Sequence, residues 1–133
     1  MTVKCILNKS ELFPKWKHIS STPLDEILII GKSYIVYGII FAPESVYYEI
    51  LTIHNNFTFS YPSFFFEVDD NRLSKFFYLG QIESGDNKYN PFISFNEWVN
   101  DNSFFSRLVD GNQEAKEIFI GYQNLLNSEY QET

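Results

Sequence analysis

The segment from Tyr34 to Ile40 is Tyr-Ile-Val-Tyr-Gly-Ile-Ile, and all of its residues except Gly38 carry an apolar or aromatic side chain. β-Branched and aromatic residues favour a strand. Because residues on both alternating faces are apolar, each face must be covered, one by the interior of a barrel and the other by a further layer. The segment therefore predicts a central strand between two apolar layers.

More strand patterns follow this segment. Residues 42–45 (Ala-Pro-Glu-Ser) are typical of a tight turn, and residues 46–53 are predicted to return as the second arm of a hairpin. The run from Phe64 to Val68 is predicted as another strand, with Phe64, Phe66 and Val68 on one face. Residues 69–71 (Asp-Asp-Asn) predict the next turn.

The pattern changes after a polar, glycine-containing stretch at residues 80–89, which predicts an exposed loop. Ser94-Phe95-Asn96-Glu97 has the spacing of a capping box, so we expect a helix to start there. From Ala115 to Leu126 the apolar residues follow the i, i+3, i+4, i+7 spacing of one buried helix face.

The composition fits one folded domain. The chain has 133 residues, of which 44% are hydrophobic and 19% aromatic, and this length supports a single core. We expect a barrel part over residues 1–80, a helical part over 90–128 and a frayed tail over 129–133. The predicted fold class is α+β, a small antiparallel β-barrel with two or three C-terminal helices packed on it.

Short motifs in the first 80 residues resemble a group of small bacterial and phage proteins with a Src-homology-3-like barrel. The motifs are Val3-Lys4-Cys5-Ile6, Leu28-x-x-Gly31-Lys32-x-Tyr34-x-Val36-Tyr37, Tyr48-x-Ile50 and Tyr61-Pro62-x-x-Phe65-x-x-Val68. The resemblance implies a five-stranded barrel. The chain departs from the shortest members through an insertion at residues 8–22 and helices after Asn90. Barrels with added helices are similar to some immunity proteins of bacterial toxin systems, and no catalytic residue carries over.

The charge is negative and unevenly distributed. The formal net charge is −7; residues 1–32 carry five basic and three acidic residues, whereas residues 33–133 carry five basic and fourteen acidic ones. Nucleic-acid binding needs clustered Lys and Arg, so a basic protein is the better partner. One cysteine and no signal or membrane-spanning pattern predict a cytoplasmic protein without membrane contact.

Candidate catalytic and metal motifs are weak. Gly31-Lys32-Ser33 resembles the end of a phosphate-binding loop, but position 26, where the first glycine belongs, is Glu26. Cys5, His18 and His54 are scattered singly, and no third group accompanies them. Asp69-Asp70 lacks the further ligands of a calcium loop and is interpreted as a solvated turn. We therefore expect no catalytic residue, no metal site and no cofactor.

These observations favour an acidic, non-catalytic binding protein, an immunity protein that neutralises a basic toxin domain such as a nuclease. The alternatives are a generic peptide-binding or regulatory barrel module and, third, a small enzyme with a deep pocket that holds titratable groups. The candidate partner-binding residues are Asp69, Asp70, Glu83, Asp86 and Tyr89.

Overall fold

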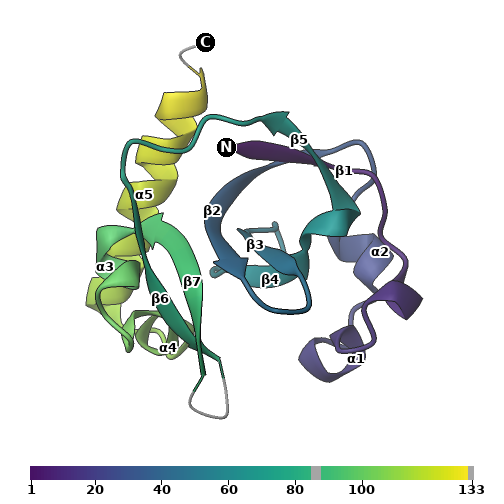
Figure 1. Ribbon diagram of the computed structural model, residues 1–133, viewed down its shortest axis with the longest axis horizontal. Coiled ribbons are helices and arrows are strands. Elements are labelled where there is room, and N and C mark those ends of the chain that lie inside the picture. Colours follow the sequence, from purple (N-terminus) through teal and green to yellow (C-terminus); the bar gives the residue numbers. More distant parts are fainter. Residues whose placement is uncertain (85–87, 132–133) are drawn as a thin grey trace.

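The computed structural model describes residues 1–84 and 88–131, in which short N-terminal helices, an antiparallel sheet and C-terminal helices follow one another (Figure 1). The strands are β1 (Thr2–Cys5), β2 (Ser33–Phe41), β3 (Val46–Ile50), β4 (Phe59–Pro62), β5 (Phe66–Asp70), β6 (Phe77–Ser84) and β7 (Lys88–Phe95). The helices are η1 (Ser10–Leu12), α1 (Trp16–Ile19), α2 (Leu24–Ile27), η2 (Ser63–Phe65), α3 (Asn96–Val99), α4 (Phe104–Val109) and α5 (Gln113–Gln131).

Strand β2 is the centre of a seven-stranded antiparallel sheet. One edge of β2 pairs with β3, which in turn pairs with β4. The other edge pairs with β1 near the start of β2 and with β7 near its end. Strand β5 extends the sheet from β1, and β6 extends it from β7. The α+β class is thus confirmed, but no pairing among the described strands joins the outer strands β4, β5 and β6, and the sheet is open.

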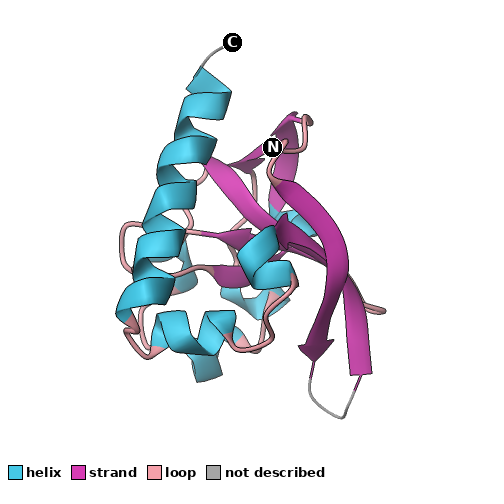
Figure 2. Ribbon diagram, turned by 90° about the vertical axis from the view of Figure 1, so that its left-hand side faces the viewer, coloured by secondary structure: helices cyan, strands magenta, loops and turns pink. Residues whose placement is uncertain are grey.

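Each face of the sheet carries its own core. On one face, which we call the first core, Tyr34 and Val36 of β2 pack with Trp16 of α1 and Leu24 of α2. On the other face, the second core, aromatic residues of β7 pack against α3, α4 and α5. The predicted central strand with two covered faces is therefore confirmed. In Figure 1, α1 and α2 lie on one side of the sheet, and α3, α4 and α5 lie on the other. Figure 2 shows α5 extending along its side of the sheet.

A β-bulge interrupts β2 at Tyr37. Val36 pairs with Ile50 and Gly38 with Glu49, so Tyr37 is an extra residue opposite β3. Such a bulge shifts the alternation of side chains by one position. Before the bulge, Val36 lies in the first core and Tyr37 in the second; after it, Ile39 lies in the first core.

Replacement of Gly38 by alanine is expected to lower the free energy of unfolding by about 1–3 kcal/mol, because the core there is already full. An added Cβ would lie 2.8 Å from Cε1 of Phe92, which is completely buried. The matched control is Gly121→Ala: Gly121 lies on an exposed position of α5 with no atom within 4 Å of the added Cβ. That change is expected to raise helix stability by about 0.5–1 kcal/mol. Urea unfolding measures both, and equal stability of the two variants would contradict the packing at Gly38.

Two of the expected strands have different limits. Strand β3 ends at Ile50, and Ile53 lies in a turn with its side chain exposed. The predicted strand at 64–68 is wrong at its start, because residues 63–65 form the 3₁₀ helix η2 with Phe65 buried and Phe64 exposed. As a result Phe65 and Phe66 are both buried in the first core, and the expected alternation of faces is lost. Strand β5 then continues through Asp70, so the predicted turn at 69–71 is also wrong at its first two residues.

The C-terminal half of the chain differs more from the elements that its sequence predicts. The predicted loop at 80–89 is mostly a hairpin: residues 80–84 belong to β6 and 88–89 to β7, while 85–87 lie outside the described residues. The capping box is not formed, because Ser94 is a strand residue whose hydroxyl donates to the carbonyl of Tyr37 at 2.7 Å. Helix α3 begins at Asn96 without a side-chain cap.

The long C-terminal helix is confirmed and exceeds its predicted range. Helix α5 continues through Gln131, where the sequence analysis expected a frayed tail from residue 129. Ser74 donates a hydrogen bond to Glu129, and the Tyr130 hydroxyl donates one to the carbonyl of Arg72. These contacts hold the end of the helix on the loop before β6. None of the helices in the described part of the chain is long and apolar enough to cross a membrane.

Candidate functional site

The predicted partner-binding residues lie at two separate places. Asp69 and Asp70 are on β5, whereas Glu83 and Tyr89 are paired opposite each other on the β6–β7 hairpin. In Figure 1, β5 lies at the upper right, whereas β6 and β7 run down the left-hand side towards the bottom. Asp86 lies outside the described residues. The structure thus brings Glu83 and Tyr89 together and keeps both away from β5.

The charge of Asp70 is compensated within the chain. Its Oδ2 lies 2.5 Å from Nη2 of Arg72, and hydrogen bonds from the Arg72 side chain hold the pKa of the Asp70 carboxyl well below its usual range. Asp69 accepts a hydrogen bond from the Ser33 hydroxyl at 3.2 Å. Of the two, Asp69 is the residue whose charge has no ion pair in the described part of the chain.

A cleft of about 640 Å³ lies between the sheet and the helices α3 and α4. Residues from β2, β3, β4 and the β6–β7 hairpin line it on the sheet side, and Trp98, Phe105 and Ser106 line it on the helix side. Its volume is in the range of ligand pockets. Two carboxylates, those of Glu49 and Glu83, line the cleft, and no Lys, Arg or His is among its described lining residues.

Glu49 is a buried residue of the cleft lining, with only 3% of its surface exposed. It lies on β3, between β2 and β4, and is paired with Gly38 of β2 on one side and Ser60 of β4 on the other. Because Gly38 has no side chain, the side chains of Phe92 and Glu49 fill the space over it. The Thr58 hydroxyl donates a hydrogen bond of 2.7 Å to Oε2 of Glu49, and the Ser60 hydroxyl donates one to Oε1.

Burial has a large effect on the protonation of Glu49. It raises the pKa of the carboxyl group above its ordinary value, and the hydrogen bonds from Ser60 and Thr58 act in the opposite direction. A buried carboxyl group without a positive neighbour prefers the neutral form. Burial thus disfavours the charged form of Glu49, and a cation beside the carboxyl group would favour that form.

Aromatic rings form the helix side of the cleft. The rings of Trp98 and Phe105 stack with centroids 5.3 Å apart and 10° between their planes, and Phe57 meets Phe105 edge to face. Phe59 lines the cleft from β4. Aromatic faces attract cations and exclude water, so a charge inside the cleft interacts more strongly than it would at the surface.

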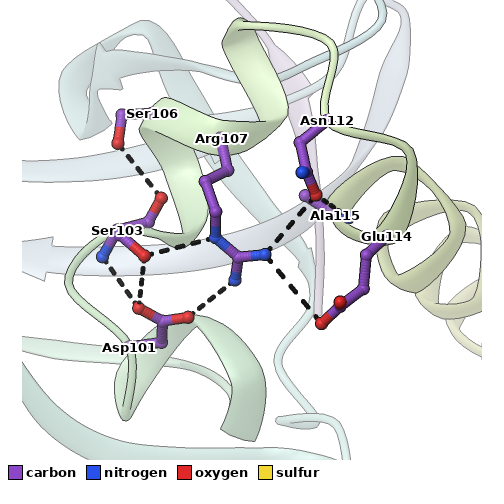
Figure 3. Close-up of polar contacts among 7 residues, drawn as sticks. All are labelled: Asp101, Ser103, Ser106, Arg107, Asn112, Glu114 and Ala115. Carbon is purple, nitrogen blue, oxygen red and sulfur yellow. Dashed lines mark hydrogen bonds and ion pairs between the residues drawn. The ribbon is translucent and has the colours of Figure 1, made fainter.

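A polar network centred on Arg107 fixes the helix that supplies Phe105 (Figure 3). Nη2 of Arg107 lies 2.7 Å from Oδ2 of Asp101, and its Nε donates a hydrogen bond to the Ser103 hydroxyl. The Arg107 guanidinium also reaches Asn112, whose side chain accepts a hydrogen bond from the Ala115 amide at the start of α5. The network therefore connects both ends of α4 to their loops.

The residues that the sequence analysis weighed for catalysis lie elsewhere. Cys5 is completely buried in the first core, and its thiol donates a hydrogen bond to the carbonyl of Leu7. His18 and His54 are exposed, and neither lines the cleft. No group of three or more His, Cys, Asp or Glu side chains in the described ranges is placed to hold a metal ion.

Sequence reasoning missed Glu49. The available signal was a carboxylate inside a strand of aromatic and β-branched residues, Tyr47-Tyr48-Glu49-Ile50, followed by two hydroxyl residues at Thr58 and Ser60. Charged residues are rarely fully buried unless they are paired. What the sequence could not supply was the cover, since Trp98 and Phe105 come from helices about 50 residues further along the chain.

No protein-family model, curated protein or solved structure matches this chain. The interpretation of the cleft therefore depends on its own geometry and charge.

Proposed function

We propose that this chain is a non-catalytic binding protein that neutralises a basic partner in the cytoplasm, most specifically an immunity protein for a basic toxin domain. The observation that supports it best is the cleft itself, which holds two carboxylates and no basic residue among its described lining. Complementary charge speeds encounter with a basic partner and penalises other partners. The negative balance after residue 32 acts in the same direction over a longer range.

The proposed interface runs from the cleft along the β6–β7 hairpin. Glu83 lines the cleft, and Tyr89, which is 53% exposed, is its partner across the hairpin. An exposed tyrosine beside an acidic group is a typical anchor in a protein interface. Asp69 and Asp70 on β5 lie apart from this interface. The relation to Src-homology-3-like barrels is a further part of this proposal.

Co-expression with the product of the adjacent upstream gene tests the function. We expect that product to stop cell growth alone and to be harmless in the presence of this chain. Glu83→Lys is expected to weaken protection strongly by placing a positive charge at the interface, and Glu67→Lys, on the exposed face of β5, is the matched control. A harmless upstream product, or toxicity that persists despite this chain, would show that the proposal is wrong.

A second candidate function, a small enzyme, is favoured by one observation. Glu49 is a buried carboxyl group with a raised pKa in a cleft of ligand size, beside two hydroxyl groups. Groups of this kind act as general acids in hydrolases. Turnover of any substrate that is lost in Glu49→Gln, with folding retained, would favour the enzyme over the binding protein.

A further inference from the structure

We propose that the Glu49 cleft is the receptor for a single basic side chain of the partner, with its ammonium or guanidinium group on the Glu49 carboxylate. This inference rests on the proposed function and names the chemistry that its central site recognises. The occupant is a lysine or arginine side chain that enters from the surface of a basic protein.

The acceptor capacity of Glu49 supports a donor-rich occupant. A carboxylate offers about four acceptor positions, and the hydroxyls of Thr58 and Ser60 use one on each oxygen. Lysine has three N–H donors and arginine has five. The hydroxyl groups also hold the carboxyl group in a fixed orientation, so the incoming cation meets an acceptor that is already placed.

The walls suit the aliphatic stem and the charged end of such a side chain. Ile40 and Ile82 line the cleft from the sheet, and Trp98 and Phe105 line it from the helices. Methylene groups of lysine and arginine pack on apolar surface while the charged end reaches a polar group. Trp98 is only 5% exposed, and its ring packs against Phe92 and Phe105, so it forms part of a fixed apolar wall.

The charges of the cleft lining disfavour anions and neutral polar groups as occupants. An anion would meet Glu49 and Glu83 with no described positive neighbour in the lining. A neutral polar group would leave Glu49 in its neutral form and would gain no attraction between opposite charges. A cation removes that cost, because it favours the charged form of Glu49 and displaces its proton. Glu83 is the other titratable residue among the described residues of the lining.

A titration followed by ¹H–¹⁵N NMR tests the proposal on the whole chain. The probes are Nα-acetyl-arginine methylamide and Nα-acetyl-lysine methylamide, with the citrulline and norleucine derivatives as neutral controls of similar shape. We expect the two cationic probes to shift the Trp98 indole signal and the amides of residues 49 and 58–60 with Kd in the millimolar range (roughly 1–10 mM), as one desolvated charge allows. The neutral probes are expected to bind at least about tenfold more weakly.

Two variants and a pH series complete the test. Glu49→Gln is expected to remove the preference for the charged probes, while Glu67→Gln on β5 leaves it unchanged. If Glu49→Gln fails to fold, a pH series on the native chain provides the test. The affinity for the arginine probe is expected to rise with pH, and the affinity for the citrulline probe is expected to stay constant. Equal affinities for arginine and citrulline, or shifts confined to residues outside the cleft, would overturn the proposal.

Two further outcomes separate this inference from its alternatives. Much tighter binding of free agmatine than of the arginine derivative would identify a free small cation as the occupant and overturn the proposal. If Glu49→Gln protects cells as well as the native chain does, no basic side chain of the partner needs the cleft. This inference would then be overturned, whereas the immunity function would stand. Conversely, a harmless upstream product would overturn the proposed immunity function, while the cleft would still bind the cationic probes.

Discussion

Replacement of Phe95 by alanine is expected to lower the free energy of unfolding by about 3–5 kcal/mol, the cost of removing a fully buried phenylalanine. Phe95 is completely buried in the second core. Its ring stacks on Tyr122 of α5 at a centroid distance of 4.1 Å and contacts Trp98 and Phe104. One side chain on β7 thus contacts all three C-terminal helices. Denaturation in urea, followed by near-ultraviolet circular dichroism, measures the loss.

The control for this experiment is Phe64→Ala. Phe64 is 47% exposed and its ring contacts Phe65, so its loss is expected to cost less than about 1 kcal/mol. A domain of this size has a stability of roughly 5–15 kcal/mol, and the Phe95 variant is therefore expected to be close to unfolding. If it does not fold, Phe95→Leu keeps most of the apolar area and is expected to lie between the two. A loss at Phe95 no larger than at Phe64 would contradict the role of the second core in holding the helices.

The parts of the fold that could be predicted from sequence are those with a long, regular pattern. Strand β2 has nine residues with apolar character on both faces, and α5 has a continuous helical period. In both elements the local preference and the final packing agree. A long pattern averages over exceptions such as the bulge at Tyr37.

Prediction failed where tertiary contacts override local signals. Ser94 has the spacing of a helix cap, but its position opposite Gly38 in the sheet gives its hydroxyl a different partner, the carbonyl of Tyr37. Gly80 looks like a loop residue, yet it is paired with Phe92 in the hairpin. A Cβ at position 80 would collide with Val99 of α3. This glycine therefore permits close packing, and its turn preference is not used.

The candidate site shows the same division. Glu83 and Tyr89 were predicted from polarity and exposure, and the hairpin does bring them together. Glu49 has the same residue type as Glu83, but a different environment. Its burial depends on α3 and α4 covering the sheet, which no local pattern near residue 49 expresses. Surface residues are thus easier to propose than buried polar ones, although the buried group carries the more specific chemistry.

The second large effect is expected from Glu49→Gln on the pH dependence of stability. Burial raises the pKa of Glu49 in the folded chain, whereas a glutamate in the unfolded chain titrates near 4.3. The contribution of the neutral carboxyl group to stability is therefore fully present below about pH 4, and it is lost as pH rises through the higher folded pKa. Glutamine keeps the shape of the side chain and has no proton to lose.

Relative to the native chain, Glu49→Gln is expected to have similar stability at pH 4 and higher stability at pH 7. The difference at pH 7 is expected to be about 1 kcal/mol or more. At this pH the native chain must either bury an ionised Glu49 or keep the group protonated, and both lower the free energy of unfolding. In a domain of this length a difference of about 1 kcal/mol raises Tm by about 4 °C. Thermal unfolding of both proteins between pH 4 and pH 8 measures the trend.

The control is Glu67→Gln, which removes the same formal charge from an exposed position on β5. Its stability difference from the native chain is expected to stay within about 0.5 kcal/mol across the series. Addition of Nα-acetyl-arginine methylamide at pH 7 gives the complementary result: a ligand that binds the folded state raises Tm, and it is expected to do so for the native chain and not for Glu49→Gln. A difference between native and Glu49→Gln proteins that is constant from pH 4 to pH 8 would mean that folding does not raise the pKa of Glu49, and the expected pH dependence would be wrong.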